Sequence, residues 1–195
     1  LAWPVAVSML TIWAAPKGLP MLAQAALTLA LVTPFGTLIY RLAYESLAED
    51  VLSLVAQRFE EAMPLRTLRL HGDCHPGNVL WTEKGPHFVD LDDCMTGPAV
   101  QDLWMLLSGR PQEMRAQLDD IVEGYQEFAD FDQHETALIE PLRTLRIMHY
   151  AGWLARRWDD PAFPRAFPWF QEPKYWEQHV LNLRAQVAAM EEPFS

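Results

Sequence analysis

Apolar side chains recur at helical spacing over most of the chain, and this pattern sets the expected architecture. Between residues 45 and 62 they share one face of a predicted helix, with the capping-box pair Ser46 and Glu49 at its start and Pro64 at its end. After Pro98 the helical spacing continues, and we expect helices over residues 100–108, 112–129, 133–158 and 175–191. The second of these should carry one apolar stripe, formed by Met114, Leu118, Ile121, Tyr125 and Phe128.

A different pattern interrupts the helices between residues 66 and 91. Short strands are predicted over residues 66–70, 78–81 and 87–91, with a turn over residues 82–86 that the Gly85-Pro86 pair signals. Residues 71–77 then form a loop before a small hairpin. The predicted fold class is α+β, mainly α, with one β-hairpin. Residues 161–173, rich in proline and aromatic residues, should form a loop packed by its own rings.

The first 40 residues are apolar and carry one charge, Lys17. The uncharged stretch of residues 19–40 is long enough to raise the question of a membrane span. Pro20, Pro34 and Gly36 interrupt it, and no basic region precedes it as in a signal peptide. We therefore expect residues 1–40 to be a poorly defined apolar segment, with membrane association disfavoured, and residues 41–195 to form one lobe.

Charge and cysteine content narrow the range of partners. The formal net charge is -11 and the isoelectric point is about 4.9, which argues against nucleic acid as a partner. ATP stays compatible with this charge, because a metal ion can screen its phosphates from acidic side chains. The two cysteines, Cys74 and Cys94, give no sign of a disulfide scaffold, so a reducing cytoplasm is the expected location.

The loop and hairpin carry the residue types that phosphoryl transfer requires. The segment His71-Gly-Asp-Cys-His-Pro-Gly-Asn78 is followed by Phe88-Val-Asp-Leu-Asp-Asp93. Asp73 and Asn78 have the separation of the base and the metal-binding amide in the kinase catalytic loop. Asp90 would supply a second oxygen ligand for Mg²⁺, which usually keeps some of its waters. The spacing therefore predicts a site in which Asp73, Asn78 and Asp90 converge on a divalent cation.

These segments resemble the aminoglycoside phosphotransferase and choline kinase group, whose pattern is H-G-D-x-H-x-x-N followed by a hydrophobic strand ending in I-D. Here Val89 stands before Asp90, a departure that keeps the strand apolar. LHGDCHPGNVLW, GPAVQDLWMLLSG and DPAFPRAFPW resemble, more narrowly, the stress response kinase A family of bacterial serine/threonine kinases. The resemblance implies a kinase-like catalytic lobe, Asp73 as catalytic base, Asn78 and Asp90 as Mg²⁺ ligands, and ATP as phosphoryl donor.

Other residues near the loop are expected to support this site. Asp102 opens a helix, and in kinase-like folds an aspartate there accepts hydrogen bonds from the loop backbone; a helix-terminal carboxylate is the plainer alternative. His71 should support the loop, and His75 should support it or lie near the phosphates. Asp92 is either a further metal ligand or part of a solvated acidic turn. A zinc cluster is disfavoured, because so short a loop rarely supplies every ligand.

The resemblance also implies an N-terminal lobe that grips the nucleotide, and the sequence contains neither its glycine-rich loop nor a convincing lysine. We therefore expect a C-terminal lobe that alone binds Mg-ATP weakly, turns over negligibly, and self-associates through an exposed apolar interface. Two other functions stay open. One is a kinase for a small hydroxyl-bearing amine or antibiotic, and the other is a non-catalytic binding module.

Overall fold

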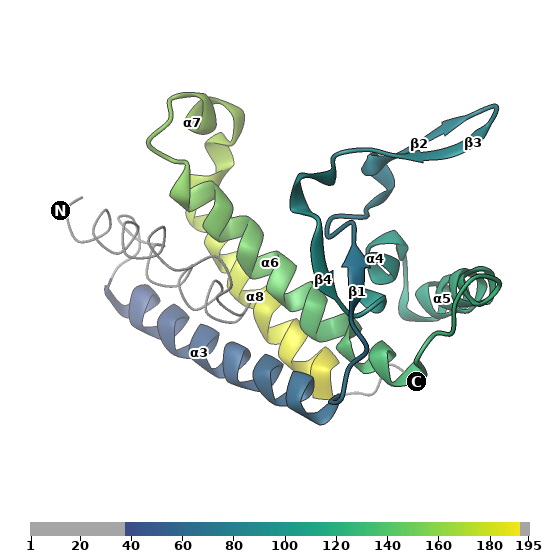
Figure 1. The fold of residues 1–195 in the computed structure, drawn as a ribbon. Helices are drawn as coiled ribbons and strands as arrows, with labels where there is room; N and C mark the ends of the chain where they lie inside the picture. Colours follow the sequence, from purple (N-terminus) through teal and green to yellow (C-terminus); the bar gives the residue numbers. More distant parts are fainter. Residues whose placement is uncertain (1–37, 192–195) are drawn as a thin grey trace. The chain divides into compact units, whose positions relative to one another are not determined.

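The computed structural model describes residues 38–191, which group into two compact units (Figure 1). The described part of unit 1 comprises residues 38–61 and 140–191, and unit 2 comprises residues 62–139. The predictions for residues 1–37, which include most of the stretch that raised the membrane question, concern a segment outside this description. The division at residue 40 stays a prediction. None of the helices between residues 38 and 191 is long and apolar enough to cross a membrane.

Unit 1 is built from three long helices that lie side by side (Figure 1). They are α3 (Leu38–Glu61), α6 (Ile139–Arg156) and α8 (Pro173–Glu191). Their shared core is fully or almost fully buried and includes Val51, Val55, Leu145, Met148 and Leu183. The helices predicted around residues 45–62 and 175–191 are confirmed, because their apolar positions do share one buried face.

The predicted start of the first helix is wrong. Helix α3 begins at Leu38, so Ser46 and Glu49 lie within it and cap nothing. Capping-box spacing is a local signal, and a helix that continues through it on packing interactions overrides that signal.

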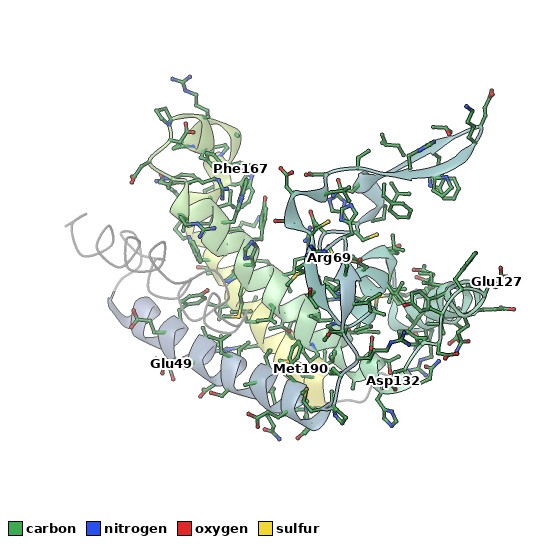
Figure 2. The ribbon with its side chains drawn as sticks, viewed as in Figure 1. Glu49, Arg69, Glu127, Asp132, Phe167 and Met190 are labelled. Atoms are coloured by element: carbon green, nitrogen blue, oxygen red, sulfur yellow. The ribbon has the colours of Figure 1, made fainter. Side chains whose placement is uncertain are left out.

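The proline-rich and aromatic segment of unit 1 packs through its own rings, as predicted. The rings of Phe163 and Phe167 lie 5.8 Å apart between centroids, and Trp153 of α6 lies 5.1 Å from Phe163 and 6.1 Å from Phe167. Phe167 is labelled in Figure 2. The segment is more regular than the predicted loop, because it contains helix α7 (Ala162–Ala166) and the 3₁₀ helix η5 (Pro168–Gln171).

Unit 2 contains the predicted hairpin and a second strand pair that was not predicted. The hairpin turn is Glu83-Lys84, and the second strand of the hairpin begins at Gly85 and ends at Phe88 rather than spanning residues 87–91, because Gly85 and Pro86 already pair with Thr82 and Trp81. Strands β2 (Val79–Thr82) and β3 (Gly85–Phe88) pair antiparallel, with Val79 opposite Phe88 (Figure 1). Strand β1 (Leu68–Leu70) pairs with β4 (Met95–Gly97), which the sequence pattern did not indicate. Three residues are too few to show an alternation, so β4 becomes visible only through its partner.

The helical part of unit 2 follows β4. Its elements are α4 (Val100–Leu103), the 3₁₀ helix η3 (Trp104–Leu106), α5 (Pro111–Gln126) and the 3₁₀ helix η4 (Gln133–Leu138). Met114 and Leu118 of the predicted stripe are buried, whereas Phe128 is 90% exposed. Phe128 lies beyond the end of α5, where helical periodicity no longer governs which side chains turn inward. The predicted class, α+β and mainly α, is confirmed.

Candidate active site

The loop between β1 and β2 is closed by its own hydrogen bonds. It ends in the 3₁₀ helix η1 (Pro76–Asn78), which His75 caps by accepting the Gly77 N–H at Nδ1 over 3.0 Å. The Asn78 N–H donates to the His75 carbonyl over 2.9 Å. One imidazole nitrogen of His75 is thus committed to loop geometry, and the other lies 3.6 Å from Oδ2 of Asp73.

The side chain of Asn78 is fixed against Asp73. Its Nδ2 donates to the Asp73 carbonyl over 2.9 Å, and the residue is buried. Because the amide nitrogen is committed in this way, the amide oxygen Oδ1 is directed away from that carbonyl. The Asp73 carboxylate retains 20% of its side-chain exposure. The loop therefore offers one partly open carboxylate and one oriented amide oxygen.

Backbone contacts hold Asp90 next to this loop. The Val89 N–H donates to the Asn78 carbonyl over 3.0 Å, and Nε2 of His71 lies 2.8 Å from the Val89 carbonyl, which can only accept. Asp90 follows in the left-handed region, at φ 62° and ψ 64°. Non-glycine residues rarely adopt this conformation, and asparagine and aspartate adopt it more readily than most. The turn exposes the Asp90 side chain immediately after a residue that is bonded to both ends of the loop.

A close backbone approach joins the loop to the residues after Asp90. Gly72 has a φ of 87°, and a Cβ atom at this position would collide with the Asp93 carbonyl oxygen. Only glycine satisfies both the backbone angle and the contact. Asp92 lies in the same turn, the 3₁₀ helix η2 (Leu91–Asp93), and is exposed.

Helix α4 holds the other side of the loop. Both oxygens of Asp102 accept backbone N–H groups, from His71 over 2.7 Å and from Gly72 over 2.9 Å. Gln101 adds a bond from its Nε2 to the Gly72 carbonyl over 3.2 Å. Sequence reasoning missed Gln101, because a glutamine beside a helical aspartate usually faces solvent and gives no signal of its own.

His71 and Cys74, two further loop residues, make contacts that support the fold of the loop. Nδ1 of His71 accepts the Asp73 N–H over 3.4 Å, so this ring bridges the loop and the Val89 carbonyl. Burial raises the pKa of the buried Cys74 thiol to about 11, and the nearby Asp102 and Asp73 carboxylates add to the effect. A thiol protonated at neutral pH is a poor nucleophile, which favours a packing role for Cys74.

The donor set suits a hard cation with few protein ligands. Within the described part of the chain, no group of three or more His, Cys, Asp and Glu side chains is arranged to hold a metal ion. The Asn78 amide oxygen and the Asp90 carboxylate are hard oxygen donors. Mg²⁺ uses such ligands together with waters and substrate phosphates, so these two residues fit it.

Comparison with known proteins gives matches at the level of family, relatives and fold. The model of the phosphotransferase enzyme family matches residues 21–139. Stress response kinase A of Escherichia coli strain K12 is 48% identical over 151 residues, which cover 77% of this chain and 45% of that protein. Serine/threonine protein kinase RdoA of Salmonella typhimurium is 54% identical over 127 residues, which cover 65% of this chain and 38% of that protein.

A solved structure extends the likeness to the fold. A choline/ethanolamine kinase family protein from Mesorhizobium loti superposes with a TM-score of 0.53 at 14% identity, covering 94% of this chain and 67% of that one. The chain spans less than half the length of the two bacterial kinases it matches. The narrower likeness inferred from the motifs is confirmed by these relatives.

Proposed function

The chain belongs to the phosphotransferase enzyme family, and from this premise we propose that it supplies the catalytic loop of an ATP-dependent kinase. The observation that carries the proposal is the set of bonds joining the Asp73–Asn78 loop to the Val89–Asp90 segment. These bonds hold the two backbone segments next to each other, and the segments carry the candidate base and both candidate metal ligands. Catalysis of phosphoryl transfer depends mainly on such positioning of groups before the reaction.

Asp73 orients the acceptor hydroxyl and accepts its proton. Its carboxylate is partly open, which leaves room for a hydroxyl to approach. The proton has to reach this oxygen directly, because a general base works within hydrogen-bond distance of the group it deprotonates. Nε2 of His75, at 3.6 Å, borders the same oxygen and is placed to limit its rotation or to meet a phosphate.

Asn78 and Asp90 hold the metal. Their oxygens would bind Mg²⁺, which in this chemistry neutralises charge on the phosphoryl oxygens of ATP. The bond from Nδ2 of Asn78 to the Asp73 carbonyl fixes the orientation of this amide, which supports the assignment. Asp92, exposed in the following turn, is a further candidate ligand.

His71 and Asp102 act as positioning residues for this loop. Asp102 binds the two N–H groups that precede Asp73, and His71 ties the loop to the carbonyl that precedes Asp90. Neither side chain needs to touch the substrates. Each restricts the backbone on which a reacting group is carried, so that less order has to be gained when substrates bind.

The acceptor we propose is a serine or threonine hydroxyl of a protein, as the name of the Salmonella relative says of that protein. The rival acceptor is a small amino alcohol, which the net charge of -11 would attract if the alcohol carried a positive charge. The cytoplasm, where ATP is available and thiols stay reduced, is the proposed location.

Metal binding can be tested on the chain itself. We expect Mn²⁺, a paramagnetic stand-in for Mg²⁺, to broaden the NMR amide signals of Asn78 and Asp90 in the ¹⁵N-labelled chain. Asn78→Ala and Asp90→Ala should each weaken the effect, whereas Thr82→Ala at the far end of β2 is the control and should leave it intact. Uniform weak broadening of all acidic surfaces would refute the assignment.

Activity can be tested in a chimaera that joins this chain to the remaining part of the Escherichia coli relative. Labelled phosphate from ATP should reach serine or threonine of a generic basic protein rather than a panel of amino alcohols. Asp73→Ala should lower the rate by about a hundredfold or more, the usual contribution of a positioned base. Undiminished phosphorylation by that variant would remove Asp73 from the mechanism.

A further inference from the structure

Glu135 of unit 2 has a buried carboxylate and lies outside the loop that carries Asp73. It belongs to η4 and is 2% exposed. Its Oε2 accepts the Val100 N–H over 3.0 Å, and the Ala99 N–H also bonds to it. A buried carboxylate is costly unless such bonds compensate for its lost water. Glu135 therefore has a defined task at the start of α4.

That start needs a partner, because α4 does not cap itself. Ala99, the residue before the helix, has helical angles of φ -56° and ψ -37° and makes no side-chain cap. Helix α4 spans four residues. A helix this short is not stable alone, since the cost of its first turn is never recovered by further hydrogen bonds. The position of α4 in unit 2 consequently depends on the hydrogen bonds made at its ends.

Glu135 is itself held in place by its neighbour Asp132, labelled in Figure 2. The Asp132 side chain accepts the His134 N–H over 3.0 Å, and its carbonyl accepts the Glu135 N–H over 3.0 Å. These bonds shape the first turn of η4. The carboxylate that reaches α4 thus projects from a turn with its own local support.

The residues that follow Val100 are those that hold the catalytic loop. Gln101 binds the Gly72 carbonyl, and Asp102 binds the N–H groups of His71 and Gly72. The first turn of α4 is therefore bonded at both ends. Its first N–H groups donate to Glu135, and its next two side chains, Gln101 and Asp102, bond to the loop. A shift of that turn moves both acceptor oxygens of Asp102 away from the loop.

We propose that Glu135 is a positioning residue for the catalytic loop, acting through the first turn of α4 and Asp102. The inference rests on the proposed function only where it names Asp73 as the residue being positioned. The coupling from residue 135 to residues 71 and 72 stands on hydrogen bonds alone. It assigns a role to a residue that touches neither the loop nor any proposed metal ligand among the contacts described.

A purely structural role for Glu135 predicts a different outcome from a positioning role. Loss of a fold-stabilising carboxylate raises amide exchange throughout unit 2, because every amide then exchanges through the same global opening. Loss of a positioning residue raises exchange at the start of α4 and at the loop, and leaves α5 unchanged. The amide of Val122, on the buried face of α5, provides the internal reference.

The experiment is amide hydrogen exchange by NMR on the ¹⁵N-labelled chain. Glu135→Ala should speed exchange at Val100, and at His71 and Gly72 by about tenfold or more, because these N–H groups are no longer held against fixed acceptors. Val122 should stay within about twofold, since the amides of a helix core respond only to global stability. Glu135→Gln keeps an acceptor oxygen and should restore most of the protection at all three sites. Glu123→Ala, an exposed position on α5, is the matched control.

Each other outcome overturns the proposal. Faster exchange at Val100 with His71 and Gly72 unchanged reduces Glu135 to a helix cap. Equal acceleration at Val122 makes it a general stabiliser, and a variant that fails to fold leads to the same conclusion if Glu135→Gln fails as well. Unprotected His71 and Gly72 in the unaltered chain would remove the coupling at its source. None of these results depends on phosphotransfer, so they separate this proposal from the failure of Asp73 as a base.

Discussion

Acid should destabilise unit 1 through one buried imidazole, that of His179 on α8. His179 is 4% exposed, its Nε2 lies 3.1 Å from the Tyr44 hydroxyl of α3, and its ring stacks on Tyr175 at 5.9 Å. Burial lowers the pKa of His179 from its ordinary 6.5 to about 4. The folded chain thus holds the neutral imidazole, hydrogen-bonded through Nε2 to the Tyr44 hydroxyl.

The direction of the pH dependence follows from which state binds more protons. Above pH 6.5 the imidazole is neutral in both states and contributes no pH dependence. Between pH 6.5 and about 4 the unfolded chain is protonated at this site and the folded chain is not, so stability falls as the pH falls. The full pKa difference corresponds to about 3 kcal/mol, and about 2.5 kcal/mol of it should be lost by pH 4.5.

Urea unfolding followed by circular dichroism at pH 7.5, 6.5, 5.5 and 4.5 measures the effect. The carboxylates of unit 1 also titrate in acid, so the informative quantity is the difference between the unaltered chain and His179→Gln. That difference should change by about 2.5 kcal/mol across the series, whatever constant packing cost the variant carries. His87→Gln, on the exposed hairpin, controls for loss of a surface histidine. A difference that stays flat with pH, or an NMR titration that places the His179 pKa near 6.5, would refute the reasoning.

Three further outcomes test the loop and its surroundings. Asp102→Ala leaves two part-buried N–H groups without their acceptor and should cost roughly 2–4 kcal/mol in urea unfolding, against under about 0.5 for the exposed Asp92→Ala. Gly72→Ala cannot meet both the positive φ and the Asp93 contact, so Mn²⁺ broadening at the loop should be lost in it. A thiol reagent at pH 8 should label exposed Cys94 within minutes and buried Cys74 only on denaturation, so Cys94→Ser should abolish native-state labelling; rapid labelling of that variant would contradict the raised pKa of Cys74.

Local sequence patterns were sufficient for the parts of the fold whose stabilising contacts are also local. The β2–β3 hairpin was predicted from two apolar runs around a turn signal, and its turn and pairing both lie within residues 79–88. The turn itself is Glu83-Lys84, because Gly85 and Pro86 already pair with Thr82 and Trp81. The loop before the hairpin was placed by its position between two strands. The stripe on α5 was correct only up to Tyr125, because a helical pattern states which face is apolar and says little about where the helix ends.

Contacts between distant segments account for what the sequence left hidden. Strand β4 has three residues and exists because β1 pairs with it, with Leu68 opposite Gly97. The bond between Glu135 and Val100 joins residues 35 positions apart, and no spacing rule reaches so far. Asp102 was identified as a loop anchor from a family resemblance. Spacing alone could not have identified it, because its partners lie about thirty residues earlier in the chain.

The division between local and distant contacts also separates the chemistry of this site from its support. Every candidate for proton transfer or metal binding lies between Asp73 and Asp92, in the loop and hairpin of unit 2. Asp102, which accepts the His71 N–H, and Glu135, the proposed positioning residue that accepts the Val100 N–H, come from elements that follow the hairpin in the sequence. The proposed coupling predicts that a chain can keep the whole H-G-D-x-H-x-x-N pattern and still lose an ordered loop when one carboxylate outside the pattern changes. Competence in this family has to be judged from the acceptors of the His71 and Gly72 amides as well as from the pattern that contains them.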